Sequence, residues 1–103
     1  MSSNTPYKLK FLSSFWVDFA TAIEDLSAYN SVWSAQRFVA TTEKKLDTVR
    51  TFPNGYPKHH LFPEYRKFIV MGYIVFYKVY DDSKTVEIRR LINGRMNLKR
   101  FII

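Results

Sequence analysis

The residues of this sequence with the clearest chemical potential are arginines and lysines that are interleaved with aromatic residues in its last third. Guanidinium groups can hold phosphates and exposed tyrosines can stack on bases, as binding of single-stranded RNA requires. Basic residues on strands are also often solvated or protect a sheet edge, so the pattern alone is not specific. The basic residues are Arg66, Lys67, Arg89, Arg90, Arg95, Lys99 and Arg100, and the aromatic ones are Tyr65, Tyr73, Tyr77 and Phe101.

The net charge of +7 is concentrated in the second half of the chain. Residues 1–52 contain six Lys/Arg and five Asp/Glu, whereas residues 53–103 contain ten Lys/Arg and four Asp/Glu. A basic surface of this kind attracts a polyanionic partner, either nucleic acid or an acidic protein. A charge that only maintains solubility is the alternative interpretation.

Histidines, carboxylates, cysteines and glycines offer little further chemistry. The only two histidines, His59 and His60, have no partner carboxylate or third ligand at a recognisable spacing, so we expect both on a loop surface. The chain has no cysteine, which excludes thiolate zinc sites and cysteine nucleophiles. Its three glycines lie far apart and form no phosphate-binding loop. We therefore predict no metal site and no cofactor.

The basic residues flank a strand that we place at the centre of a sheet. Tyr73–Tyr80 is apolar or aromatic at nearly every position, as a strand covered on both faces requires. Turn signals at 71–72 and 81–84 separate it from the strands Tyr65–Met71 and Thr85–Ile92. Connections this short make neighbouring strands antiparallel.

The first half of the chain predicts one strand and two helices. Tyr7–Leu12 alternates between apolar and lysine side chains, which is typical of a half-buried strand. The serines at 13–14 are candidate N-caps for a helix that ends near Tyr29. Ser31 is the candidate cap of a second helix, which the breaker cluster at 52–57 ends. The connection of about three residues makes the two helices antiparallel.

The order strand, helix, helix, strand, strand, strand predicts an α+β domain in which the helices cover one face of the sheet. Residues 1–103 contain no repeat or low-complexity tract and form a single domain, with a short basic tail at 95–103. The longest apolar run, Phe68–Tyr77, is about half of the roughly 20 residues that a membrane-spanning helix needs. We therefore expect a soluble cytoplasmic protein without a membrane partner.

The last third of the chain resembles the RelE/ParE superfamily of bacterial type II toxins. Tyr73-Ile-Val-Phe-Tyr-Lys-Val79 and Val86-Glu-Ile-Arg-Arg-Leu-Ile-Asn-Gly-Arg-Met-Asn97 are similar to the pattern FYRV…V.I.RVLHGRR with which its members commonly end. The order of the elements extends the resemblance over nearly the whole chain. It implies a small toxin that arrests growth until a cognate antitoxin neutralises it, and that contacts operator DNA only through the toxin–antitoxin complex.

The superfamily divides by target. RelE-like members are ribosome-dependent mRNA endoribonucleases, in which basic residues stabilise phosphate charge and a Tyr, His or Glu transfers a proton. Their central strand typically starts Tyr-Arg-Leu-Val-Tyr with the arginine in the active site, and the matching residue here is Ile74. Asn93 stands where a histidine is common, and Met96 falls near a second arginine. The matching basic residues, which are the candidates for a catalytic role, are Arg66, Lys67 and Arg95.

These departures favour a ParE-like toxin, a group that is linked to poisoning of DNA gyrase. The alternatives are a RelE-like mRNA endoribonuclease, which would be an enzyme, and a non-toxic basic module that binds RNA or DNA. Strand alternation places Arg89 and Arg90 on opposite faces, so only one of them can belong to the target-binding surface. We expect an antitoxin to bury apolar surface along the helices or beside the sheet and to offer acids to the basic region. The predicted target-binding residues are Arg66, Lys67, Arg89, Arg90, Arg95, Asn97 and Arg100.

Overall fold

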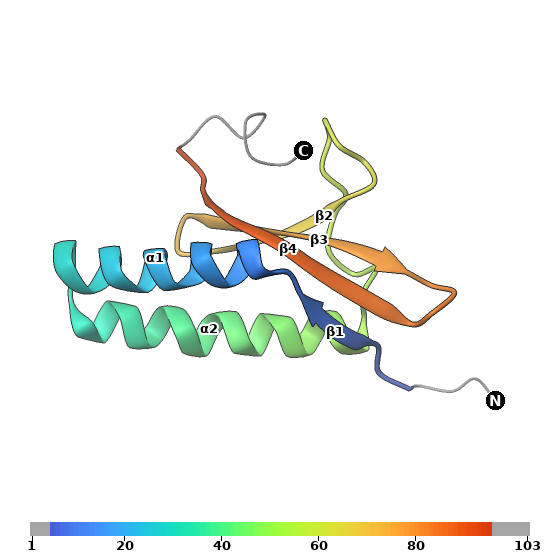
Figure 1. Cartoon of the computed structure of the whole chain (residues 1–103), viewed down its shortest axis with the longest axis horizontal. Helices are drawn as coiled ribbons and strands as arrows, with labels where there is room; N and C mark the ends of the chain where they lie inside the picture. Colours follow the sequence, from blue (N-terminus) through green and yellow to red (C-terminus); the bar gives the residue numbers. More distant parts are fainter. Residues whose placement is uncertain (1–4, 96–103) are drawn as a thin grey trace.

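The computed structural model describes residues 5–95, in which two helices pack on one face of a four-stranded sheet (Figure 1). This arrangement confirms the predicted α+β class and the predicted order of elements. Within these residues, neither helix has the length and apolar character needed to cross a membrane. The elements are β1 (Lys8–Phe11), α1 (Ser13–Tyr29), α2 (Val32–Thr51), β2 (Arg66–Val70), β3 (Tyr73–Tyr80) and β4 (Thr85–Asn93).

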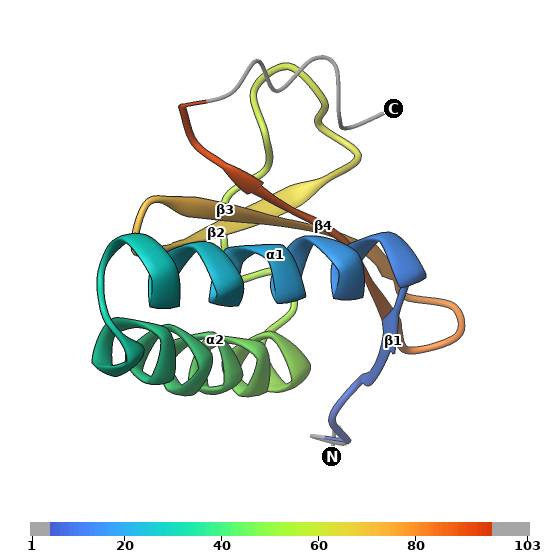
Figure 2. The same cartoon turned by 60° about the vertical axis from the view of Figure 1, so that its left-hand side comes forward.

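The sheet is mixed and has the strand order β1-β4-β3-β2. Strands β2, β3 and β4 form the predicted antiparallel meander, in which Ile74 of β3 lies between Ile69 and Ile92. Strand β1 pairs in parallel with β4, with Leu9 opposite Val86. The helical hairpin therefore leads the chain across one face of the sheet before the meander returns to β1 (Figure 2).

The two helices begin in different ways. Ser31 is the N-cap of α2, as predicted, and its Oγ accepts a hydrogen bond from the backbone N–H of Ser34 at 3.0 Å. The N-cap of α1 is Leu12 and has no side-chain cap bond, so the predicted cap at 13–14 is wrong. Ser14 Oγ instead donates to the backbone oxygen of Arg89 at 2.9 Å. The first turn of α1 is thereby attached to β4.

The helices and the sheet enclose an aromatic core. The ring of Phe19 lies 5.4 Å from that of Phe15 and 5.6 Å from that of Phe38, and Phe38 lies 5.2 Å from Tyr73 of the sheet. Contacts of this kind stabilise the packing beyond the burial of area alone. The buried residues that the strands contribute to this core are Phe68, Val70, Val75, Tyr77, Val86, Ile88 and Leu91.

The opposite face of the sheet carries a smaller apolar cluster beneath the loop 52–65, which rises from that face in Figure 1. Ile74, Phe76 and Ile92 are buried there, and Phe62 and Tyr65 of the loop pack against them. Four consecutive residues of β3 are buried as a result. This confirms the prediction of a central strand that is covered on both faces.

Candidate functional site

The two adjacent arginines of β4 lie at a β-bulge. Phe76 and Tyr77 are consecutive in β3, but they pair with residues 90 and 88 of β4, so Arg89 is an additional residue. The prediction that strand alternation separates Arg89 from Arg90 is therefore wrong, because the bulge interrupts the alternation at this point.

Both arginines are associated with the face of the sheet away from the helices. Arg90 lies opposite Phe76, which belongs to the cluster on that face. The guanidinium carbon of Arg89 lies 5.3 Å from the ring centroid of Tyr65, which packs against the same cluster. The structure thus brings together two predicted residues that sequence reasoning had separated.

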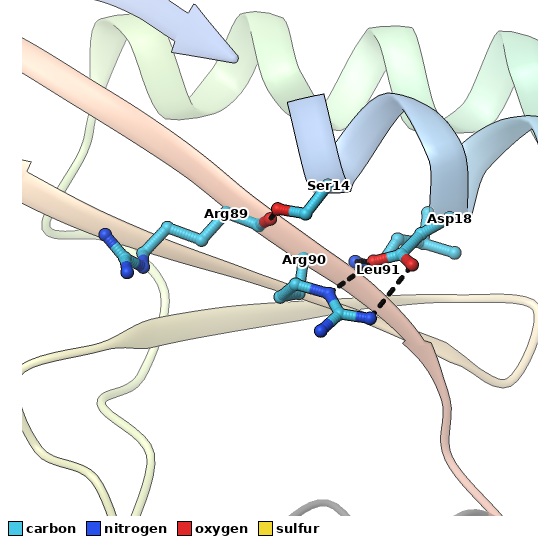
Figure 3. A network of polar contacts seen from close by, with 5 residues as sticks. All are labelled: Ser14, Asp18, Arg89, Arg90 and Leu91. Atoms are coloured by element: carbon cyan, nitrogen blue, oxygen red, sulfur yellow. Dashed lines mark hydrogen bonds and ion pairs between the residues drawn. The ribbon is translucent and has the colours of Figure 1, made fainter. Parts of the chain in front are cut away.

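Arg90 is held by α1 (Figure 3). Its Nε donates to Asp18 Oδ2 at 2.7 Å and its Nη2 donates to Oδ1 at 3.0 Å, which makes the pair bidentate. Asp18 Oδ2 also accepts from the backbone N–H of Leu91 at 3.0 Å. The side chains of Arg90 and Asp18 are only 27% and 14% exposed. The pair therefore joins α1 to the part of β4 that lies beyond the end of its pairing with β1.

Arg89 is also paired with a carboxylate. Its Nη1 donates to Glu87 Oε1, and the same oxygen accepts from the hydroxyl of Tyr80 at 3.4 Å. The Glu87 side chain is 13% exposed, so much of its interaction with solvent has been replaced by these contacts. The positive charges of both β4 arginines are consequently balanced within the protein, which weakens their attraction for a phosphate.

Arg66 lies at the end of the sheet, in a polar cleft of about 320 Å³. Its Nη1 donates to the backbone oxygen of Tyr56 at 2.7 Å, which fixes the guanidinium against the loop. The cleft holds charges of both signs with an excess of cations, so it can attract an anionic group. The charged residues that line it are Lys58, Glu64, Arg66, Lys78 and Asp81.

The remaining predicted residues do not gather around this cleft. Lys67 lies on β2 opposite Phe76. Arg95 is exposed, and its backbone N–H donates to Asn93 Oδ1 at 3.0 Å. The predicted residues Asn97 and Arg100 and most of the basic tail lie outside the described residues.

Ile74 occupies the position that matches the active-site arginine of the RelE-like nucleases. It is 9% exposed and belongs to the cluster beneath the loop, where Phe62 packs. Burial of an unpaired guanidinium at such a position would be costly, because the charged group would lose its hydration. This environment suits the packing of the loop on the sheet.

His59 is buried beneath the loop and is 1% exposed, so its predicted surface position is wrong, whereas His60 is exposed. Its Nδ1 accepts hydrogen bonds from the backbone N–H groups of Leu61 at 3.0 Å and Phe62 at 3.3 Å. The ring is therefore neutral and carries its proton on Nε2, which is buried without a partner among the described residues. Burial, followed by the charges of Lys67 and His60, lowers the pKa of His59.

The described residues contain no group of three or more metal-ligating side chains placed to hold an ion. The site is thus a set of paired arginines, a basic cleft and a neutral buried histidine on a small α+β scaffold of the type found in RelE and ParE toxins. A family model described as the ParE toxin of the type II toxin-antitoxin system parDE matches residues 9–98. The chain belongs to this family of type II toxins, which confirms the resemblance seen in its last third.

Solved structures share the fold at low sequence identity. The chromosomal ParDE toxin-antitoxin system from P. aeruginosa has a TM-score of 0.73 and 15% identity, covering 88% of this chain and 98% of that chain. The toxin-antitoxin complex RelBE2 from Mycobacterium tuberculosis has a TM-score of 0.60 and 19% identity, with coverages of 85% and 98%. The isolated RelE toxin from E. coli has a TM-score of 0.59 and 20% identity, with coverages of 93% and 99%. No curated protein sequence matches this chain.

Proposed function

We propose that this chain is a ParE-like toxin that inhibits DNA gyrase without ribonuclease chemistry and that a cognate antitoxin neutralises it. The observation that carries the proposal is the pairing of the β4 arginines with carboxylates. Arg89 is paired with Glu87, and Arg90 with Asp18. A ribonuclease of this fold needs cations that are available to stabilise charge on a phosphate. At Ile74 such a cation is replaced by an apolar side chain.

The described residues also offer little for proton transfer. His59 is buried and uses its Nδ1 to accept two backbone hydrogen bonds, so its lone pair is not available to a substrate. Burial, and then the charge of Asp25, raises the pKa of Tyr73, which disfavours a phenolate base. These features agree with a toxin that acts by binding its target.

The match to the ParE family model over residues 9–98 supports the same assignment. Gyrase is the target to which the resemblance to ParE-like toxins points. Since gyrase and the ribosome are both cytoplasmic, either target places the action of the toxin in the cytoplasm. Binding of operator DNA would require the complex with the antitoxin.

A RelE-like mRNA endoribonuclease is the second candidate, and the cleft around Arg66 favours it. Arg66 shares this cleft with Lys58 and Lys78, so an anionic backbone could be held there. Lys67 and Arg95 would be the other basic residues of such a site.

Induction of the chain in a bacterial host, together with a supercoiling assay on purified gyrase and mapping of transcript ends, separates the two candidates. We expect growth arrest and inhibited supercoiling with intact mRNA. Codon-phased cleavage at ribosomal A sites that disappears in Arg66→Ala would contradict the proposal. Lys8→Ala is the matched control, because Lys8 is an exposed cation on β1 outside the cleft. Restoration of growth by the co-expressed antitoxin tests the neutralisation.

A further inference from the structure

Strand β2 forms one edge of the sheet, and part of its backbone is open. Lys67 donates its N–H to the oxygen of Pro57 at 3.1 Å, and the oxygen of Ile69 accepts from Lys45 Nζ at 2.7 Å. Both bonds point away from β3. Because the N–H and C=O of one strand residue point to the same side, the Lys67 oxygen and the Ile69 N–H also point outward. Within residues 5–95 neither group has a hydrogen-bond partner.

Lys45 of α2 shields this edge. Its ammonium occupies the Ile69 oxygen, which is the group that a neighbouring strand would use as an acceptor. A lysine at a sheet edge discourages unwanted pairing. Its long side chain is flexible, so the ammonium can leave the carbonyl for a carboxylate at little cost. Lys45 therefore closes the edge to chains that carry no acid.

The surroundings of the edge are apolar. Ile69 is 52% exposed, although it lies at the centre of the open segment. A largely apolar cleft of about 210 Å³ runs beside it. A strand added here would pair with open backbone groups and bury apolar surface in one step, as in β-strand addition by a peptide. The residues that line this cleft are Lys45, Tyr56, Pro57, Lys67, Phe68 and Ile69.

We infer that this edge of β2 receives an extended segment of the antitoxin that carries an apolar and an acidic residue two positions apart. The inference rests on the proposed neutralisation by a cognate antitoxin. Residues two apart on a strand share a face, as Lys67 and Ile69 do. The apolar residue packs on Ile69 and the acidic residue lies beside Lys67, in either strand direction. The displaced Lys45 ammonium pairs with a further carboxylate of the segment.

A second copy of this chain does not fit the same edge. Symmetric pairing of two β2 strands would place Lys45 and Lys67 against the lysines of the other copy, and like charges at such positions are destabilising. The net charge of +7 adds to this repulsion. An acid-bearing segment has the complementary charge.

Amide hydrogen exchange of the isotope-labelled protein, alone and in complex with the co-expressed cognate antitoxin, tests the inference. We expect the Ile69 amide to exchange rapidly in the free protein and about 100-fold more slowly in the complex. Leu9 is the matched control on the opposite edge. Its neighbour Lys8 donates inward to the oxygen of Lys84, so the Leu9 amide points outward. We expect no comparable protection of Leu9.

A complex in which Ile69 still exchanges rapidly would overturn the inference while leaving the proposed neutralisation intact. Slow exchange of Ile69 in the free protein would overturn it as well, because the edge would then already be covered. If no complex forms, the proposed neutralisation fails and the inference falls with it.

Charge reversal supplies a second measurement. Lys67→Glu should weaken antitoxin binding about 10-fold, because it replaces the contact with an acid by a repulsion. Lys8→Glu makes the same change of net charge on β1 and should have a much smaller effect. Equal losses for the two variants would indicate only long-range attraction and would contradict a contact at β2.

Discussion

The helices bury one face of the sheet under a continuous aromatic core, whereas the loop 52–65 covers only a small cluster around Phe76 on the other face. The first face is sealed by two long elements that contact several strands. The second is closed by a loop whose buried imidazole bonds to its own backbone, and it is bordered by paired arginines. Stability should therefore depend mainly on the helix side, and the polar contacts of the loop side should contribute smaller amounts.

The largest expected effect comes from truncation of the helix-side core. Phe38→Ala should lower the free energy of unfolding by about 4 kcal/mol, because Phe38 is fully buried between the rings of Phe19 and Tyr73. Phe76→Ala on the loop side should cost less, about 3 kcal/mol, because the loop can collapse into the space. Urea denaturation of both variants measures the difference. A greater loss in Phe76→Ala would break the comparison between the faces.

Loss of the ion pair between α1 and β4 should have the next largest effect. Asp18→Asn should cost about 2 kcal/mol, because it weakens charged hydrogen bonds to a partly buried guanidinium. Asp47→Asn is the matched control, since the Asp47–Arg50 pair is exposed and has an N···O distance of 3.5 Å. The control should change stability by less than about 0.5 kcal/mol. Similar denaturation midpoints for the two variants would show that the Arg90 pair contributes no more than a surface pair.

Removal of one buried hydroxyl should have a smaller effect. Tyr77 donates to the oxygen of Pro53 at 3.0 Å, and Tyr77→Phe should cost about 1 kcal/mol because that carbonyl loses its partner. Burial raises the pKa of Tyr77 to about 12, so the wild-type phenol should stay protonated in an ultraviolet titration up to that pH. Tyr80→Phe is the control, because its hydroxyl is more exposed and its bond to Glu87 is long at 3.4 Å. Ionisation of every tyrosine near pH 10 would contradict the burial of Tyr77.

The smallest expected effect is a pH dependence from His59. Its pKa is lowered from 6.5 in the folded protein, so below pH 6.5 the unfolded chain takes up a proton that the folded chain does not. Stability should be complete above pH 6.5 and should fall as the pH decreases from 6.5 toward the lowered pKa. Denaturation at a series of pH values measures this slope. His59→Gln should reduce the slope, whereas His60→Gln should preserve it, and the opposite result would contradict the assignment to His59.

Several features of the fold could be predicted because their causes are local. The unbroken apolar run of β3 predicts burial on both faces, and Ser31 lies where the backbone needs a cap. The errors occur where a distant element changes a local rule. Ser14 does not cap α1 because the Arg89 oxygen accepts its hydroxyl. His59 is buried because the loop folds onto Phe76, a contact that no spacing within the loop predicts.

The sequence by itself determined the elements, their order, the antiparallel meander and the concentration of positive charge in the second half, since periodicity, turn signals and composition act over short distances along the chain. Only the tertiary structure decided what the basic residues do. Asp18 and Arg90 are 72 residues apart, and a bulge in β4 sets the direction of the arginines. Their pairing follows from the packing of α1 against the edge of β4, so charge that seemed free in the sequence is already balanced in the fold.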